Sequence, residues 1–265
     1  MSEGISYRFT RAVVRTPCND VIHGLRAVER GAPDAALFRA QHLEYRGILE
    51  SLGLEVTVLP ALEEFPDSVF IEDTALCLPE GAIILRPGTD SRRGEALASA
   101  ESLDSMGLDL MEIGPEGTVD GGDILVTGPV ILVGLSARTN LRGFESLRTI
   151  LAGWGYDARV VDTPADVLHF KSGCNALDDE TLLCTSCLAN DPQLREFRIL
   201  TVPPGEEAAA NSIRVNDKVL VPRGFPATAD LLTDAGFDVE LLPVSQPALL
   251  DGGLSCMSLR FSSSG

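Results

Sequence analysis

The side chains of this chain best suited to chemistry are a cysteine and a histidine. Cys256 lies in the stretch LLDGGLSCMSLRF, close to the end of the 265-residue chain, and His169, in VLHFKSG, is one of 3 histidines. A cysteine thiolate can attack an electrophilic carbon while an imidazole moves protons, so the pair predicts covalent catalysis if the fold brings them together. The alternatives are a buried structural cysteine and a hydrogen-bonded core histidine.

Acidic residues are concentrated in short segments that otherwise read as apolar strands, although carboxylates usually lie at the surface. Several carboxylates around one pocket repel one another, and a guanidinium, which is planar and has five N–H donors, would relieve that repulsion. Glycines follow Asp120 and Asp251 and would let the backbone approach a ligand closely. The candidate residues, found in FPDSVFIED, VDGGDIL and LLDGG, are Asp67, Glu72, Asp73, Asp120, Asp123 and Asp251.

Two arginines can complement this acidic group. Arg92, in PGTDSRR, and Arg138, in LSARTN, each lie between a predicted hairpin and a predicted helix, where a side chain can fold over the mouth of a pocket. A carboxylate at the far end of a ligand would account for both. Scattered surface arginines are the alternative.

The remaining cysteines carry a weaker signal. The CTSC segment at 184–187 has no second cysteine pair and no nearby histidine, so it is a poor candidate for zinc or redox chemistry. Cys77 and Cys174 stand in strand-like segments and are expected in the core. Since neither GxGxxG nor a P-loop occurs, we predict no cofactor and no metal.

The polar candidates recur at a regular interval. Glu72, Asp120, His169, Asn211 and Cys256 are separated by 48 (72 to 120), 49 (120 to 169), 42 (169 to 211) and 45 (211 to 256) residues. Intervals of this size are typical of propellers and other repeat arrays. Equivalent positions of such units meet at the axis of a ring, so the spacing predicts that Cys256, Glu72, Asp120 and His169 share one central pocket.

The elements around these positions repeat as well. Amphipathic periodicity and the glycines that follow it predict helices at 34–51, 92–106, 140–152 and 228–235, and a weaker one at roughly 187–196. Each is followed by a short apolar strand, and then by a hairpin whose first strand opens on or beside the polar residue. The strands lie at 54–60, 108–114, 156–164, 197–203 and 237–245.

The fifth unit stops after one strand of its hairpin, because the chain ends at Gly265. An additional strand at 8–15 has no unit of its own and can supply the missing one, which would close the ring and protect its sheet edges. We therefore predict an α/β fold: a five-bladed α/β propeller with pseudo-five-fold symmetry, closed by the N-terminal strand, with residues 1–265 as a single domain.

Composition narrows the functional class. With 45% hydrophobic residues the chain can bury a substantial core, and its net charge of −18 argues against nucleic-acid partners. A cationic small ligand is the electrostatic counterpart, and a charge that serves only solubility is the alternative. The apolar runs are too short to span a membrane and the N-terminus has no secretory h-region, so we expect a soluble cytoplasmic protein. The sequence leaves the oligomeric state open, a homodimer included.

Six segments, in this order, resemble one enzyme family: FPDSVFIEDTAL, RPGTDSRR, TVDGGDIL, VGLSARTN, LHFKSGC and LLDGGLSC. The family is that of the dimethylarginine dimethylaminohydrolases, which belong to the pentein, or amidinotransferase-like, superfamily of five-bladed α/β propellers. The resemblance covers nearly the whole chain. It implies hydrolysis of Nω-methylated arginines to citrulline and methylamines through a cysteine thiouronium intermediate.

The resemblance also implies a role for each candidate residue. Cys256 would be the nucleophile, His169 the general acid and base, and Asp120 the acidic partner that orients the histidine. The implied substrate contacts are Glu72 and Asp73 to the guanidinium, Asp67 and the backbone carbonyls near Val21 and Leu250 to the α-ammonium, and Arg92 and Arg138 to the α-carboxylate.

Two other functions fit the same pattern less well. LSCMS is also similar to the terminal segment of arginine deiminases, so a compact deiminase or an amidinotransferase is the nearest alternative. Bacterial deiminases carry an inserted helical region, for which 265 residues leave no room. A ligand-binding pentein without turnover is the other alternative, and the presence of both Cys256 and His169 argues against it.

Overall fold

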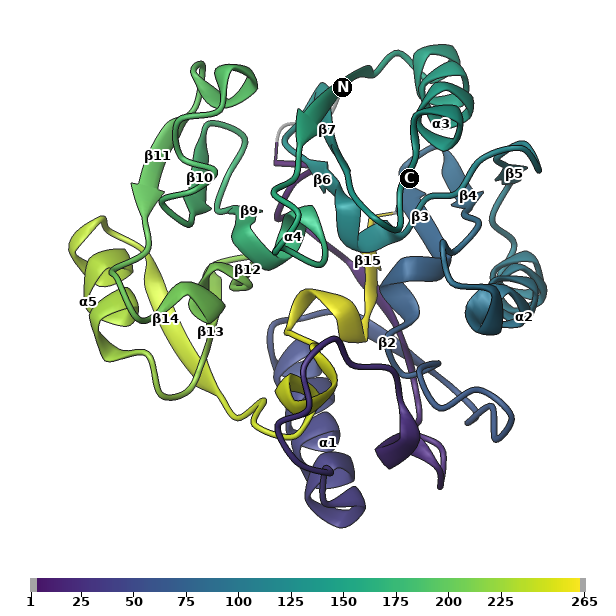
Figure 1. The fold of residues 1–265 in the computed structure, drawn as a ribbon, viewed down its shortest axis with the longest axis horizontal. Helices are drawn as coiled ribbons and strands as arrows, with labels where there is room; N and C mark the ends of the chain where they lie inside the picture. The colour runs from purple at the N-terminus through teal and green to yellow at the C-terminus, as the bar shows by residue number, and fades with distance from the viewer. Residues whose placement is uncertain (1–3, 263–265) are drawn as a thin grey trace.

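The computed structural model describes residues 4–262, which form five three-stranded sheets (Figure 1). In each sheet an inner strand pairs antiparallel with a middle strand, and the middle strand pairs parallel with an outer one. The sheets, written from inner to outer strand, are β3 (Ala75–Leu78), β4 (Gly81–Ile84) and β5 (Leu110–Glu112); β6 (Ile124–Val126), β7 (Val130–Leu135) and β8 (Asp157–Asp162); β9 (Cys174–Ala176), β10 (Thr181–Cys184) and β11 (Arg198–Thr201); β12 (Ile213–Val215), β13 (Lys218–Pro222) and β14 (Asp238–Leu242); and β15 (Leu259–Phe261), β1 (Arg11–Arg15) and β2 (Glu55–Leu59).

Parallel pairing of middle and outer strands requires a crossover, and four of the five crossovers contain an α-helix. The helices lie on the periphery of the ring of sheets in Figure 1. They are α1 (Ala35–Ser51), α2 (Arg93–Ser105), α3 (Leu141–Gly153) and α5 (Pro226–Asp234). Their bounds agree with the sequence prediction to within about two residues, as is usual at helix ends.

The predicted helix at 187–196 is wrong. The β10–β11 crossover contains a single 3₁₀ turn, Pro192–Leu194, which begins where the Asp191 side chain accepts a hydrogen bond from the Gln193 amide. Asparagine and aspartate favour turns and caps over helix interiors, and proline has no N–H to donate to a preceding turn. The segment Asn190-Asp191-Pro192 therefore interrupts the periodicity that suggested a helix.

The ring closes as predicted. β1 pairs antiparallel with β15, placing Arg11 opposite Phe261 and Val13 opposite Leu259, and pairs parallel with β2. The first strand of the chain thus occupies the middle of a sheet whose inner strand comes from the last unit. The fold is the five-bladed α/β propeller predicted from the repeat.

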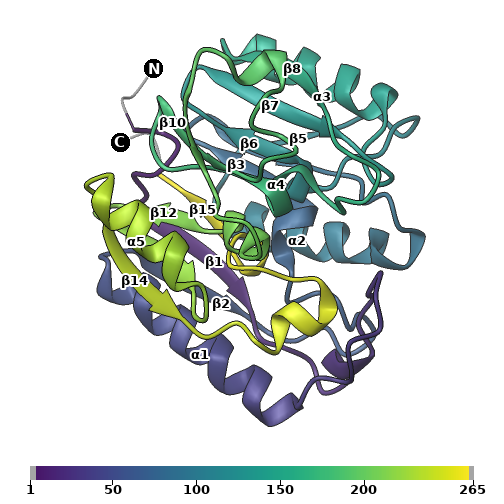
Figure 2. The same cartoon turned by 60° about the vertical axis from the view of Figure 1, so that its left-hand side comes forward.

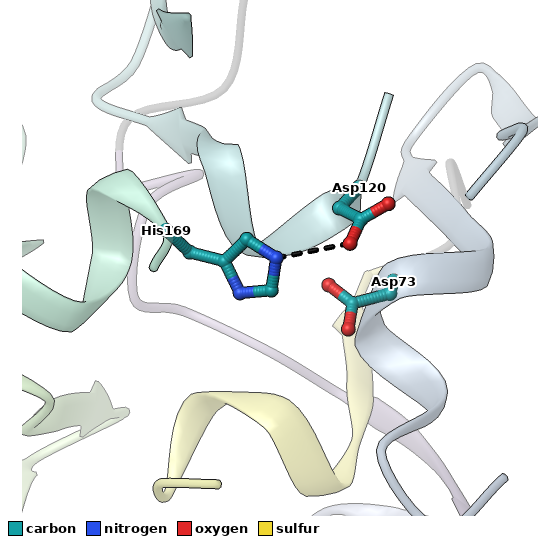
Figure 3. A group of neighbouring side chains, drawn as sticks. All are labelled: Asp73, Asp120 and His169. Atoms are coloured by element: carbon teal, nitrogen blue, oxygen red, sulfur yellow. Dashed lines mark hydrogen bonds and ion pairs between the residues drawn. The ribbon is translucent and has the colours of Figure 1, made fainter. Parts of the chain in front are cut away.

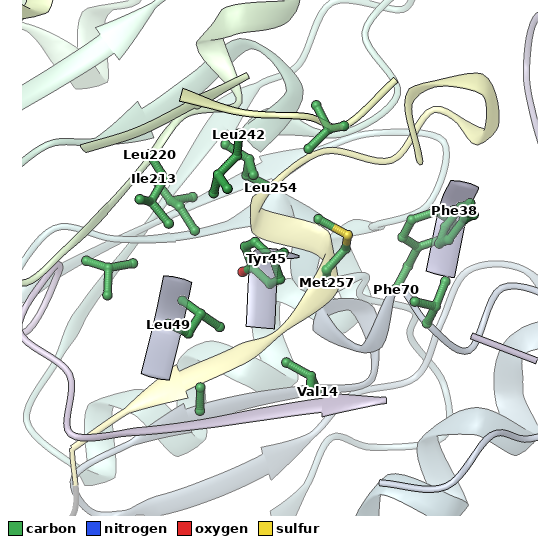
Figure 4. Packing of buried hydrophobic residues seen from close by; sticks show 14 of the residues in the cluster. Val14, Phe38, Tyr45, Leu49, Phe70, Ile213, Leu220, Leu242, Leu254 and Met257 are labelled. Atoms are coloured by element: carbon green, nitrogen blue, oxygen red, sulfur yellow. The ribbon is translucent and has the colours of Figure 1, made fainter. Parts of the chain in front are cut away.

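The closing sheet is held by a core that joins the two ends of the chain. α1 buries Phe38, Tyr45 and Leu49 at helical spacing, and these side chains pack against residues of β1, β12, β13, β14 and the C-terminal segment (Figure 4). Buried apolar area of this kind contributes roughly 25 cal/mol per Å². A buried hydrogen bond of 2.6 Å between the hydroxyls of Tyr45 and Ser258 adds a polar tie beside β15.

No helix among residues 4–262 combines the length and apolar character needed to cross a bilayer.

Candidate active site

Each predicted polar position lies in, or directly beside, a single helical turn that precedes an inner strand. The five turns are Ile71–Thr74, Gly121–Asp123, Phe170–Gly173 (α4), Glu207–Ala210 and Ser255–Met257. The inner strands therefore begin about one helical turn later than predicted, and the polar residues lie at that turn rather than at the start of the strand. His169 in particular is the N-terminal cap of α4 rather than a strand residue.

Residues in or beside three of these turns line a pocket at the middle of the ring. Cys256, His169 and Asp73 line it together, although they come from three different blades. The other lining residues are Leu25, Asp67, Phe70, Arg92, Arg138, Leu168, Leu250, Asp251 and Gly252. We call this the catalytic pocket. Leu25, Leu168 and Phe70 are apolar lining residues that no sequence motif singled out.

His169 and two aspartates form the charged centre of the site (Figure 3). His169 Nε2 lies 2.9 Å from Asp120 Oδ2, and Asp120 Oδ1 accepts a hydrogen bond of 2.7 Å from the Gly88 amide. Burial disfavours the imidazolium, but Asp73 and Asp120 outweigh it and raise the pKa of His169 to about 9. Asp120 is fully buried behind the histidine and orients it without lining the pocket.

Asp73 is held ionised by its neighbours. Its Oδ1 accepts from the Gly122 amide at 2.8 Å and its Oδ2 accepts from Arg92 Nη1 at 2.5 Å. Burial would raise the pKa of Asp73, but the positive charges of His169 and Arg92 lower it to about 2. At neutral pH a carboxylate and an imidazolium therefore face each other in the pocket.

Asp123, a candidate from the sequence, supports the site from behind. Its Oδ1 accepts from the Phe170 amide at 2.8 Å, and its Oδ2 accepts from the hydroxyls of Ser136 and Thr139 at 2.6 Å each. The first contact fixes the residue after His169. Thr139 Oγ1 in turn accepts from the Asp120 amide at 3.1 Å. One buried carboxylate thereby ties together the segments that carry the histidine and its partner.

Cys256 is partly exposed to the pocket and its thiol is protonated in the unliganded protein. Burial, followed by the negative charges of Glu72 and Asp73, raises the pKa of Cys256 to about 12. The Gly253 amide donates to its sulfur at 3.4 Å, which favours the thiolate only weakly. A cation beside the sulfur would be needed to reverse the effect of the two carboxylates.

Glu72 departs from expectation. It is absent from the lining of the catalytic pocket, and its carboxylate accepts from Lys171 Nζ at 2.6 Å, Ser255 Oγ at 2.9 Å and Arg260 Nη2 at 3.3 Å. Its side chain is turned away from Asp73, its neighbour in the chain. While these contacts hold, Glu72 does not reach a substrate guanidinium bound at Asp73. Of the four residues expected in one central pocket, Cys256 and His169 line it, and Asp120 contacts it through His169.

Arg92 also has internal partners that the sequence did not suggest. Besides Asp73, its buried guanidinium donates to Glu95 through Nε and Nη2, and to the Phe70 carbonyl through Nη2 at 2.8 Å. Arg138 is less committed. It is half-buried, donates to the Thr89 hydroxyl and lies 3.9 Å from Asp120 Oδ2.

Of the three residues expected to contact the α-ammonium, two line the catalytic pocket and one does not. Asp67 lines the pocket, where its Oδ1 accepts from the Leu25 amide at 2.8 Å, and burial raises the pKa of its carboxyl. Leu250 lines the pocket too. Val21 does not, and its carbonyl accepts from the Gly24 amide at 3.1 Å.

Asp73, Asp120 and His169 could in principle hold a metal, since one ligand atom of each lies within 4.8 Å of the others. All four carboxylate oxygens, however, already accept from Gly122, Arg92, Gly88 or His169. Each carboxylate oxygen of this group therefore already has one hydrogen-bonding partner within the protein.

The cysteines outside the pocket match expectation in part. Cys77, Cys174 and Cys184 are buried, and Cys187 is exposed. Cys174 and Cys184 face each other across β9 and β10 with their sulfurs 2.9 Å apart, a pairing that the CTSC segment did not indicate. No group of metal-binding side chains among residues 4–262 includes the CTSC cysteines.

Comparison with known proteins gives the following likenesses. The chain is 39% identical over 254 residues to the N(G),N(G)-dimethylarginine dimethylaminohydrolase of Pseudomonas aeruginosa, covering 96% of this chain and 100% of that one. It is 36% identical to the enzyme of that name from Streptomyces coelicolor, over 94% of this chain and 96% of the relative. A search against protein-family models found no match.

Solved structures agree. A cysteine-to-serine mutant of the Pseudomonas aeruginosa enzyme in complex with citrulline superposes with a TM-score of 0.92 at 38% identity, over 96% of this chain and all of that one. The N-terminal domain of the arginine dihydrolase ArgZ superposes with a TM-score of 0.85 at 18% identity, covering 96% of this chain and 98% of that one. The second likeness is evidence for the fold alone.

Proposed function

The chain belongs to the dimethylarginine dimethylaminohydrolase family, and we propose that it hydrolyses Nω-methylated arginines to citrulline and dimethylamine or methylamine. The observation that carries this proposal is the convergence of Cys256, His169 and Asp73 on one pocket from three blades. A nucleophile, an acid-base group and a fixed carboxylate are the parts that substitution at a guanidinium carbon needs.

The first step is binding of the guanidinium beside Asp73, which Arg92 and Gly122 hold in place and keep ionised. The bound cation lowers the pKa of Cys256, because it offsets the two carboxylates that raise it. The thiol then loses its proton to solvent, and the sulfur attacks the central guanidinium carbon. Binding and activation of the nucleophile are thereby the same event.

His169 moves the remaining protons. As an imidazolium it donates a proton to the departing methylamine nitrogen, leaving a thiouronium on Cys256. The neutral imidazole then takes a proton from a water molecule, whose oxygen attacks the thiouronium carbon. Collapse of this adduct expels the Cys256 thiolate and yields citrulline. Asp120 keeps the imidazole oriented, and Asp73 together with Asp120 raises its pKa.

The other end of the pocket suits the amino-acid part of the substrate. In our proposal the Asp67 carboxylate and the Leu250 carbonyl take the α-ammonium, and Arg138 takes the α-carboxylate. Arg92 contributes less there than its sequence position suggested, because most of its N–H groups already have acceptors in the protein. For Val21, the group proposed to contact the α-ammonium is the backbone carbonyl, which lies beside Gly24.

Replacement of Cys256 by serine tests the covalent step. Turnover should be lost while citrulline still binds, since the hydroxyl preserves the size of the side chain and removes the nucleophile. Citrulline production by Cys256→Ser at a rate near that of the wild type would exclude the mechanism. Cys187→Ser, at an exposed cysteine outside the pocket, is the matched control and should retain full activity.

Substrate choice distinguishes a hydrolase of methylated arginines from a compact deiminase. Each buried methyl contributes only about 0.8 kcal/mol, so strong discrimination needs a leaving-amine pocket that cannot satisfy an unmethylated NH₂. The kcat/KM values for arginine, monomethylarginine and asymmetric dimethylarginine decide between them, and arginine as the best substrate would identify a deiminase.

A cytoplasmic location stays a prediction from the sequence.

A further inference from the structure

The described residues line a second cavity, of about 210 Å³, which the proposed reaction does not use. All five inner strands line it, so it lies on the axis of the ring. Gly4 and Ser262, the first and last described residues, line it as well, and it therefore reaches the side of the molecule where the described part of the chain begins and ends (Figure 2). We call it the axial cavity. It shares no lining residue with the catalytic pocket.

The single helical turns separate the two sites. Asp73 lines the catalytic pocket, whereas its neighbour Glu72 lines the axial cavity. His169 lines the catalytic pocket, whereas Lys171, two residues later, lines the axial cavity. Each of these turns thus presents charged side chains to two separate sites, and only one of the two has a proposed role.

The charge of the axial cavity is opposite to that of the protein. Its lining includes the basic residues Arg8, Lys171, Arg214 and Arg260, and Glu72 is the one carboxylate in that lining. Arg214 is paired with Asp178, 3.8 Å away and outside the lining, so the excess positive charge is that of Lys171 and Arg260, which share Glu72. The chain as a whole carries a net charge of −18. The overall acidity of the protein does not explain why basic residues gather around a cavity on the axis. A function of the cavity itself would explain it.

At the floor of the cavity this excess of positive charge is buried. Glu72 accepts from both Lys171 and Arg260, so two cations share one carboxylate. Among the described residues, the Lys171 ammonium donates a hydrogen bond to Glu72 alone. An ammonium carries three N–H groups, so two of them have no acceptor in the described part of the chain. Buried charge without a full set of partners is costly, and an anion placed beside Lys171 would offset that cost.

Much of the wall above the floor is apolar, although Arg8 and Arg214 also line it. Its apolar residues are Leu76, Ile124, Ile213, Leu259 and Phe261, and these side chains offer no hydrogen bonds to a wholly polar guest. The volume is many times the roughly 10–15 Å³ that one buried water needs on the same measure, so it admits a small organic guest. A guest that matches both regions has one negative group and a short apolar chain.

We propose that the axial cavity is a binding site for a small organic monoanion. Its carboxylate contacts Lys171 and Arg260 at the floor, and its hydrocarbon chain lies along the inner strands. A cation of the same size is repelled by the two floor residues, and a neutral alcohol accepts a hydrogen bond from the Lys171 ammonium but does not balance its charge.

Calorimetric titration of the full chain with hexanoate, hexylamine and hexanol tests the site. Hexanoate should bind with one-to-one stoichiometry, and both other probes should bind at least about tenfold more weakly, the loss expected for a charged hydrogen bond. Saturating citrulline should leave hexanoate affinity unchanged, because the two sites share no residue. Equal binding of hexylamine, displacement by citrulline, or no binding of hexanoate would each overturn the proposal.

Variants locate the bound anion. Ala176→Leu narrows the cavity wall and Lys171→Met removes the floor ammonium, and each should weaken hexanoate binding at least about tenfold. Leu76→Phe is a second wall variant, for use if either of these unfolds. Arg138→Ala, in the catalytic pocket, should leave hexanoate binding unchanged. Loss of binding in Arg138→Ala, with binding retained in the wall variants, would place the anion in the catalytic pocket and refute the axial site.

Discussion

The charges of individual residues set the resting state of the catalytic pocket. Asp73 is ionised because its pKa is lowered to about 2, and His169 is protonated because its pKa is raised to about 9. Cys256 is a thiol because its pKa is raised to about 12. The acid that releases the amine is therefore ready before substrate arrives, and the nucleophile is not.

Alkylation of Cys256 by iodoacetamide should reveal this resting state. Only the thiolate reacts, so the rate should be low at pH 7 and should keep rising with pH beyond 9 rather than level off near the ordinary cysteine value of about 8.5. The measurement uses Cys187→Ser, since exposed Cys187 reacts on its own, with peptide mass spectrometry to follow Cys256. A plateau below pH 8 would show that the thiolate forms without a bound cation.

Arg138 is the residue with which the proposed carboxylate contact can be tested. Arg138→Ala should weaken binding of a methylated arginine by about 1.5–3 kcal/mol, as for other charged hydrogen bonds. Converting the substrate carboxylate to an amide should cost the wild type a similar amount and the variant almost nothing, because the partner is already gone. Binding is measured calorimetrically in the Cys256→Ser background. Arg142→Ala, at an exposed ion pair with Glu116, is the control, and a full cost of the amide in Arg138→Ala would disprove the contact.

At the scale of elements, the single turns before the inner strands position the chemistry, and their glycines let them approach one another. A Cβ on Gly121 would lie 1.9 Å from the Glu72 carbonyl oxygen, and one on Gly122 would lie 2.6 Å from His169 Nδ1. In the second Asp-Gly-Gly, a Cβ on Gly252 would meet the Phe70 ring at 2.2 Å. The repeated motif thus reflects close packing of turns from different blades around the axis.

Gly122→Ala should therefore damage catalysis through geometry alone. The added methyl displaces His169, and loss of its acid-base assistance should lower kcat by about 10²–10⁴-fold. Gly153→Ala, in α3 with open space around the glycine, is the matched control and should leave kcat unchanged. The comparison is made by steady-state kinetics with thermal unfolding of both variants. Normal kcat in folded Gly122→Ala would mean that His169 tolerates the shift.

At the scale of the whole molecule, the charged pocket links stability to pH. The folded pKa of His169 is raised from 6.5 to about 9, so its contribution is complete below pH 6.5 and is lost as the pH rises through 9. The folded pKa of Asp73 is lowered from 3.8 to about 2, so its contribution is complete above pH 3.8 and is lost as the pH falls through 2. The two contributions are both present between about pH 4 and 6.5.

The free energy of unfolding should consequently fall on the order of 3 kcal/mol between pH 6.5 and 9, from the His169 shift alone. Urea denaturation at a series of pH values measures it. In His169→Asn this part of the decline should disappear, because asparagine does not titrate. If the variant declines as steeply as the wild type, other groups cause the alkaline loss of stability.

Much of the architecture was contained in the sequence, because it depends on local patterns. The spacing of the polar positions from Glu72 to Cys256 predicted five units, and helical periodicity with the glycines that follow it predicted four of the crossover helices. The unpaired strand near the N-terminus predicted the closing sheet. The spacing also predicted that Cys256 and His169 meet, since equivalent positions of a closed ring lie together at its axis.

What only the tertiary structure decided is the direction in which each side chain points. Successive residues of a 3₁₀ turn are rotated by about 120°, so Asp73 and Glu72 face different sites although they are adjacent in the chain. His169 and Lys171 also line different sites, since His169 is the extended N-terminal cap of α4 and Lys171 lies within that helical turn. The structure likewise decided the role of Arg92, because its donors are occupied by Asp73, Glu95 and the Phe70 carbonyl. A sequence records which residues occur at each repeat position. Which of them reach the catalytic pocket depends on the packing of five turns against one another, and that packing exists only in the closed ring.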